Sequence, residues 1–265
     1  MGTCKECFSI LNVYWKYTRK WFLGIVVGMA ALELGLLLYY VNGGFRYMYI
    51  IENDDKHWSM EYAGALKSIR LEYIIPVFAV AFMVFLTLSY FSVSGKNSSI
   101  LLQRLPISTK MQNLMQITHS LIMLLSFWLV QFLIIIIGFF LYRYSAPDGL
   151  QIDLQIFKAF WGPGFLYKLY PFLNLGYIFT WMLCLINLSI LPSCIVHRSR
   201  MKDGPEPSWV AGILLIILIT LLLFSQFGEE MKTVYNMVFL FMLALAMIWS
   251  MFFREVHLHM GAHNK

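Results

Sequence analysis

The chain has 265 residues, of which 60% are hydrophobic and 13% are charged, and its mean hydropathy is +0.69. Soluble domains carry about 45–50% apolar and about 25% charged residues, so this composition excludes an ordinary soluble globular enzyme. The apolar residues fall into long runs that can cross a bilayer as helices, and we therefore predict an all-α membrane protein.

The first element in chain order, residues 1–20, is predicted to be a cytoplasmic amphipathic helix that lies in the membrane interface. Apolar side chains recur at helical spacing on one face, whereas Ser9, Asn12 and Lys16 fall mostly on the other. The apolar face comprises Cys7, Ile10, Leu11, Tyr14, Trp15 and Tyr17. The remainder, residues 21–265, is predicted to be a single transmembrane domain.

Six apolar runs predict six transmembrane helices joined by short loops. They cover residues 21–41, 73–93, 117–142, 170–196, 210–227 and 234–253. Lys and Arg outnumber Asp and Glu on the side that carries both termini, whereas the acids are slightly more numerous on the other side. The positive-inside rule then places both termini in the cytoplasm. This asymmetry explains the net charge of +6, which suits anionic membrane lipid and requires no nucleic acid.

Glu33 is the one acidic residue inside a predicted span, where an ionised carboxylate costs about 2.5–3.5 kcal/mol. Gly24, Gly28 and Gly35 form a stripe nearly opposite Glu33, and small residues at this spacing favour close helix packing. If the stripe packs inside the bundle, Glu33 faces a subunit interface or a water-accessible path. The alternative is a carboxylate that is protonated or hydrogen-bonded to a neighbouring span.

Gln131 in the third predicted span and Asn187 in the fourth are the next polar residues at membrane depth. Hydrogen bonding between helices explains each of them adequately. Together with Glu33, they are also the candidates for residues that line an intramembrane pathway or a subunit interface.

The loop between the second and third spans carries a short apolar helix. Ser98 or Ser99 can cap its N-terminus, and Leu105-Pro106 ends it before the third span. A short helix after the second span, followed by Leu-Pro-[Ile/Val]-Ser and a basic residue, resembles the ABC-2 type permeases of bacterial ABC exporters. Leu105 to Ser108 carries the motif, and the six spans with both termini inside match the layout.

The resemblance implies a coupling helix that docks on a separate ATP-binding subunit, which holds the ATP and Mg²⁺. The matching positions are Ile100, Leu101, Leu102, Arg104, Leu105 and Pro106. It also implies a second copy or a related permease subunit as partner, in a bacterial plasma membrane. The short link from Gly228 to Thr233 leaves little room for external helices, which favours exporters of small drugs or peptides, including bacteriocin-immunity systems.

No catalytic or nucleotide-binding motif is recognisable in the chain. The string closest to a phosphate loop, Ser94-Gly95-Lys96-Asn97, lacks the first glycine and the hydroxyl residue, so we expect neither a cofactor in this chain nor an enzyme. Cys4, Cys7 and the tail histidines make a zinc site conceivable, but a lone C-x-x-C is a weak signal and we assign no metal. The alternative function is a non-transporting sensor or assembly protein that acts through its outer loops.

Overall fold

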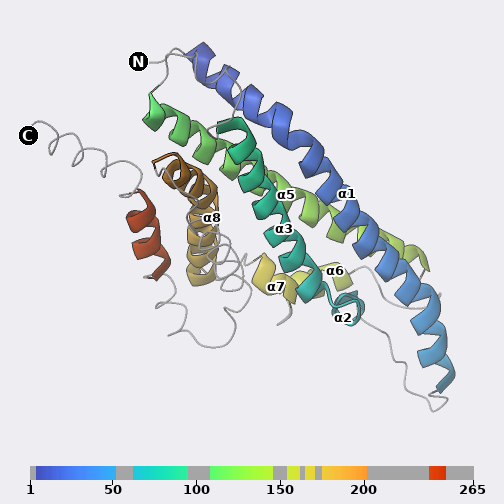
Figure 1. Ribbon diagram of the computed structural model, residues 1–265. Coiled ribbons are helices and arrows are strands. Elements are labelled where there is room, and N and C mark those ends of the chain that lie inside the picture. The colour runs from blue at the N-terminus through green and yellow to red at the C-terminus, as the bar shows by residue number, and fades with distance from the viewer. Residues whose placement is uncertain are drawn as a thin grey trace, which may run out of the picture.

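A computed structural model of the chain describes residues 4–51, 62–94, 108–145, 154–161, 165–170, 175–201 and 239–248. These residues are almost entirely helical and include no strand, which confirms the all-α class. Four helices are long and apolar enough to cross a membrane: α1 (Cys4–Ile51), α3 (Leu71–Ser94), α5 (Thr109–Ser145) and α8 (Leu175–Met201) (Figure 1). The chain is therefore a multi-spanning helical membrane protein.

The four long helices overlap the first four predicted spans, although α5 begins eight residues before the third span and α8 begins five residues after the start of the fourth. The fifth predicted span, 210–227, lies outside the described residues. Of the sixth, 234–253, the structure describes the apolar helix Phe239–Ile248, which packs beside α8 (Figure 1).

Helix α1 joins the predicted N-terminal helix and the first predicted span without a break. It runs continuously from Cys4 to Ile51. The sequence around residue 20 contains neither proline nor glycine, and the buried stripe crosses this point without losing its helical spacing. The stripe comprises Ile10, Tyr14, Thr18, Phe22, Ile25, Met29, Glu33, Leu37 and Val41. The amphipathic face of residues 7–17 thus extends the face that α1 packs into the bundle.

Helix α5 begins at a conventional N-terminal cap. The Ser108 carbonyl accepts hydrogen bonds from the N–H groups of Met111 and Gln112 at 3.0 and 3.1 Å, and the Ser108 hydroxyl accepts from Met111 N–H at 3.3 Å. These bonds satisfy donors that have no partner inside the first turn of a helix. The cap defines where α5 begins. Helix α5 packs against both α1 and α8.

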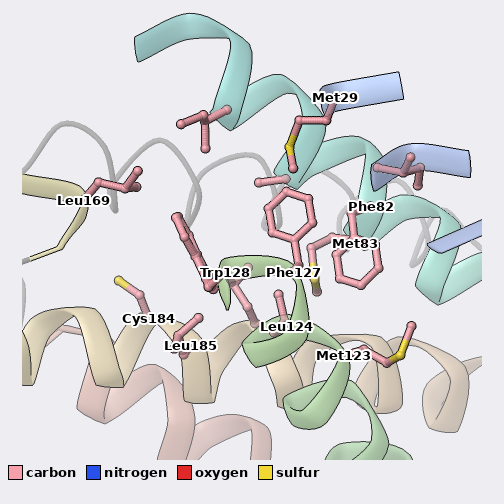
Figure 2. Packing of buried hydrophobic residues seen from close by; sticks show 14 of the residues in the cluster. Met29, Phe82, Met83, Met123, Leu124, Phe127, Trp128, Leu169, Cys184 and Leu185 are labelled. Atoms are coloured by element: carbon pink, nitrogen blue, oxygen red, sulfur yellow. The ribbon is translucent and has the colours of Figure 1, made fainter. Parts of the chain in front are cut away.

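Aromatic and methionine side chains fill the space between α1, α3, α5 and α8, as Figure 2 shows. Phe82 of α3 stacks on Phe127 of α5 with ring centroids 5.2 Å apart, and Trp128 meets Trp181 of α8 edge to face at 5.6 Å. Such pairs contribute about 0.5–1.5 kcal/mol each beyond their buried area. Because lipid tails are as apolar as these side chains, close packing of this kind holds membrane helices together.

Three short helices gather at the end of the bundle away from the N-terminus: α2 (Tyr62–Ser68), α6 (Gln155–Trp161) and α7 (Phe165–Leu169) (Figure 1). Gln155 Oε1 accepts a hydrogen bond from the Tyr62 N–H at 2.9 Å, so α6 caps the start of α2. Helix α2 ends at Ser68, and Arg70, whose φ is 57°, turns the chain into α3. Tyr62 at the start of α2 and Tyr170 directly after α7 reach α5 with their side chains.

Candidate functional site

Glu33 and Gln131, two of the predicted site residues, meet inside the bundle. Glu33 lies on α1 and is 3% exposed, and Gln131 lies on α5 and is fully buried. The Gln131 side-chain amide donates a hydrogen bond from Nε2 to Glu33 Oε2 at 2.9 Å. The structure therefore brings together two residues that are 98 positions apart, and it joins α1 to α5 through a polar contact at membrane depth.

Two tyrosines flank this pair along α5. The Tyr62 hydroxyl donates to the carbonyl of Ile135 at 2.7 Å, and the Tyr170 hydroxyl donates to the carbonyl of Trp128 at 3.2 Å. Their acceptors lie four residues after and three residues before Gln131. Both tyrosines are close enough to Glu33 for a charge there to act on them. We call these four residues, Glu33, Gln131, Tyr62 and Tyr170, the carboxyl–amide site.

Burial keeps the Tyr62 phenol protonated. Removal of the side chain from water raises the pKa of Tyr62 well above its usual value. The protonated hydroxyl can therefore hold its hydrogen bond to the Ile135 carbonyl at any physiological pH. Tyr62 acts as a fixed neutral donor beside the carboxyl–amide pair.

Two oxygen atoms of the pair are left without partners. Among the described residues, Glu33 Oε1 and Gln131 Oε1 accept no hydrogen bond, although both are buried. A buried polar atom without a partner costs about 1–3 kcal/mol, and more when it carries charge. The pair is therefore equipped to accept one more donor.

The predicted glycine stripe lies on the other side of α1. Gly24, Gly28 and Gly35 are all exposed, and a Cβ added at Gly24 or Gly35 would meet nothing within 4 Å. At Gly28 its nearest neighbour would be Phe78 Cε1 at 3.8 Å. In the described part of the chain, the glycines do not pack inside the bundle with Glu33 facing outward. The arrangement is the reverse, because the large apolar side chains of α1 share the face of Glu33 and bury it with them.

Gly138 on α5 is a closely packed glycine that sequence reasoning missed. A Cβ there would lie 3.1 Å from both Leu37 Cδ2 of α1 and the Tyr62 hydroxyl. The lack of a side chain lets α1 and α2 approach α5 beside the carboxyl–amide site. Gly138 has no small partner at the spacing of a packing motif, so only the neighbouring helices reveal its role.

Asn187 is used elsewhere in the fold. Its amide nitrogen donates to the Leu183 carbonyl at 2.8 Å and to the Leu240 carbonyl at 3.0 Å. It thus ties α8 to the helix Phe239–Ile248, as the hydrogen-bonding explanation of this residue predicts. Asn187 does not join Glu33 and Gln131 through any hydrogen bond in the described residues.

A second polar cluster, which the sequence did not predict, lies at the N-terminal end of the bundle. The Tyr90 hydroxyl of α3 is hydrogen-bonded to His119 Nδ1 at 2.7 Å and to Ser120 Oγ at 2.9 Å. His119 Nε2 lies 3.4 Å from Thr18 Oγ1 on α1. The edge of the Tyr14 ring packs against Tyr90 at 5.3 Å. These contacts join α1, α3 and α5.

The same cluster continues into α8. The Ser193 hydroxyl donates to Gln116 Oε1 at 3.1 Å, and Asn113 Nδ2 lies 3.2 Å from His197 Nδ1. We call the whole set the polar network. Its members are Thr18, Tyr90, Asn113, Gln116, His119, Ser120, Ser193 and His197. Along α1 the polar network and the carboxyl–amide site are separated by about 20 Å at 1.5 Å per residue.

Several predicted features lie outside the described residues. They are the coupling helix with Ile100, Leu101, Leu102, Arg104, Leu105 and Pro106, and the tail histidines of the conceivable zinc site. Cys7, the one cysteine of that site whose side chain is described, is half-buried and packs against the apolar core.

No protein-family model, curated protein or solved structure matches the chain. The resemblance to ABC-2 permeases therefore stays a prediction from the sequence. A functional proposal has to rest on that resemblance together with the two polar clusters.

Proposed function

We propose that the chain is the permease subunit of an ABC-2 type exporter, which moves a small amphipathic molecule or peptide with ATP hydrolysed on a separate subunit. The observation that carries the proposal is the position of the polar network. It lies where α3 ends and α5 begins, on either side of the loop with the proposed coupling helix. The same network reaches α1 through Thr18 and α8 through Ser193.

This position suits the transmission of force from the loop. A push on residues 95–107 acts first on the ends of α3 and α5, which Tyr90, His119 and Ser120 hold together. Because the network also includes α1 and α8, the four helix ends would move as one unit. The positive-inside rule places this end at the cytoplasmic face, where an ATP-binding subunit with its ATP and Mg²⁺ would dock.

The carboxyl–amide site would then be the part of the bundle that rearranges when the cytoplasmic helix ends move. Glu33 and Gln131 join α1 to α5 about 20 Å further along, so a change at the cytoplasmic end would alter the contact between these two helices. Polar groups at membrane depth are costly and are typical of transport pathways. We assign Glu33 and Gln131 to this pathway and leave Asn187 as a link between helices.

The exposed glycine face of α1 suits the second permease subunit, either another copy of the chain or a related one. Gly24, Gly28 and Gly35 present a surface on which a partner helix can approach closely. The proposed location is a bacterial plasma membrane, with both termini in the cytoplasm.

The test is purification of the tagged full chain from its native membrane, followed by an assay for ATP hydrolysis in the purified sample. We expect hydrolysis to co-purify with the wild type and to be lost when Leu101 and Leu102 are both replaced by Asp. The matched control is Leu154→Asp, which alters a leucine that is 72% exposed before α6, at the other end of the bundle, and should retain the hydrolysis.

Two results would contradict the proposal. If no ATP hydrolysis co-purifies with the wild type, the alternative of a non-transporting sensor or assembly protein is favoured. If hydrolysis co-purifies equally with the Leu101→Asp, Leu102→Asp variant, the coupling-helix assignment is wrong.

A further inference from the structure

The chemistry of the carboxyl–amide pair can be followed without the proposed transport activity. Glu33 and Gln131 are planar groups that already share one hydrogen bond, from Gln131 Nε2 to Glu33 Oε2 at 2.9 Å. Each group has one further oxygen, and neither Glu33 Oε1 nor Gln131 Oε1 has a partner among the described residues. One donated hydrogen atom between these two oxygens would complete a paired arrangement.

The neighbouring elements supply no positive charge to this pair. From α2 and from the residue after α7, the titratable groups near Glu33 are Tyr62 and Tyr170, whose hydroxyls donate to carbonyls of α5. From α3, the side chains that meet α1 are aromatic rings. They include Phe78, Phe82 and Phe85 beside residues 21–28 of α1, and Tyr90 beside Tyr14 further away from Glu33. An ionised Glu33 would thus have the Gln131 amide as its hydrogen-bond donor and no cationic partner in the described part of the bundle.

The number of free oxygens favours a proton over a metal ion. A hard cation such as Ca²⁺ takes about 6–8 oxygen ligands, whereas the pair offers two free oxygens. A proton needs only a covalent bond to one oxygen and a hydrogen bond to another. Bound to Glu33 Oε1, it would convert the carboxylate into a carboxylic acid that donates to Gln131 Oε1.

We propose that Glu33 and Gln131 form a proton-binding site between α1 and α5. Hydronium from the solvent supplies the proton and leaves as water, an O–H bond forms at Glu33 Oε1, and the neutral acid pairs with the Gln131 amide through two hydrogen bonds in a ring. Both unpartnered oxygens are satisfied by this one proton. The bound proton holds α1 against α5, because a bare carboxylate at the same place would be buried without a countercharge.

Infrared spectroscopy of the full chain in lipid vesicles at neutral pH tests this site. We expect the difference between wild type and Glu33→Gln to contain the carbonyl band of a hydrogen-bonded carboxylic acid, which shifts in D₂O. The Glu33→Gln variant should fold, since two amides can form the same ring of two hydrogen bonds. Glu72→Gln is the matched control, because Glu72 is a half-buried acid 3.8 Å from Arg70, and its replacement should remove only carboxylate bands.

A second variant tests the ring itself. In Gln131→Leu the acid band should persist and shift to higher frequency, because the acid has lost its amide partner. Should Gln131→Leu fail to fold, the Glu33→Gln difference spectrum still decides whether the proton is present. An unshifted acid band in folded Gln131→Leu would overturn the pairing with Gln131.

Other outcomes overturn the proton site as a whole. If the Glu33→Gln difference contains only carboxylate bands, Glu33 is ionised and holds no proton. If those carboxylate bands also change when sodium is replaced by choline, the pair binds a metal cation in place of the proton.

Discussion

The polar network and the carboxyl–amide site are both buried between helices, but they differ in how completely the hydrogen bonds at their centres are made. At the edge of the network that faces α8, Asn113 Oδ1 has no partner in the described residues, so the comparison concerns its centre at Tyr90 and His119. In the network, the Tyr90 hydroxyl contacts His119, Ser120 and the Gln116 carbonyl, and both ring nitrogens of His119 have a neighbour within 3.4 Å. In the carboxyl–amide site, two oxygens of the central pair have no partner in the described residues.

This difference separates a structural role from a functional one. A polar centre such as Tyr90 with His119 and Ser120, in which one hydroxyl has several partners, fixes how helices meet, because any displacement breaks several bonds at once. A pair with free acceptor oxygens is stabilised when it binds a hydrogen-bond donor or a proton, so it can exist in a bound and an unbound state. We therefore interpret the polar network as the rigid end of the bundle and the carboxyl–amide site as the responsive one.

The largest effect is expected from a substitution that disrupts the close packing of α1 and α2 on α5 beside the carboxyl–amide site. Gly138→Ala would place a methyl group 3.1 Å from Leu37 Cδ2 and from the Tyr62 hydroxyl, whereas Gly35→Ala would meet nothing. The gain in helix propensity is common to both variants and cancels in the comparison. We expect Gly138→Ala to be less stable than Gly35→Ala by about 1–3 kcal/mol, as is typical of overpacking. Unfolding in detergent measures this difference, and equal stabilities would contradict the packing around Gly138.

A somewhat smaller effect is expected at the rigid end. His119→Leu removes two hydrogen bonds, each worth about 0.5–1.5 kcal/mol, and should lower the free energy of unfolding by about 1–2 kcal/mol. The control is Thr118→Val, which alters the adjacent half-buried residue and removes only a bond to the Leu114 carbonyl within α5. The same unfolding assay compares them, and a His119→Leu variant as stable as Thr118→Val would show that the network does not hold the helices.

Much of the helical layout was predictable, because long apolar runs indicate spans whatever their neighbours. Glu33 and Gln131 also stood out, since polar residues are rare at membrane depth. Their pairing was not predictable, because it depends on which face of α1 packs against α5. The glycine stripe suggested the opposite face, but the large apolar residues around Glu33 determine the buried side.

The polar network escaped prediction for a different reason. The third span was predicted to start at residue 117. Asn113 and Gln116 therefore lay in the predicted loop before it, and His119 lay within its first turn. In the structure α5 begins at Thr109, and these side chains share one buried face at helical spacing. The continuity of α1 through residue 20 was not predicted for a related reason. Tyr14 contacts Tyr90 of α3 and His119 of α5, and such contacts cannot be read from a segment that alone suggests an interfacial helix.

The most direct test of the account is a double-mutant cycle on Glu33→Leu and Gln131→Leu, with unfolding of the full chain measured in detergent. Each single variant leaves a buried polar group unpaired, whereas the double variant leaves a pair of apolar side chains that needs no partner. We predict a coupling energy of about 1 kcal/mol or more between the two positions, and additive effects when Glu33→Leu is replaced in the cycle by Gly35→Leu. Additive effects for Glu33 and Gln131 themselves would contradict the contact on which the carboxyl–amide site depends.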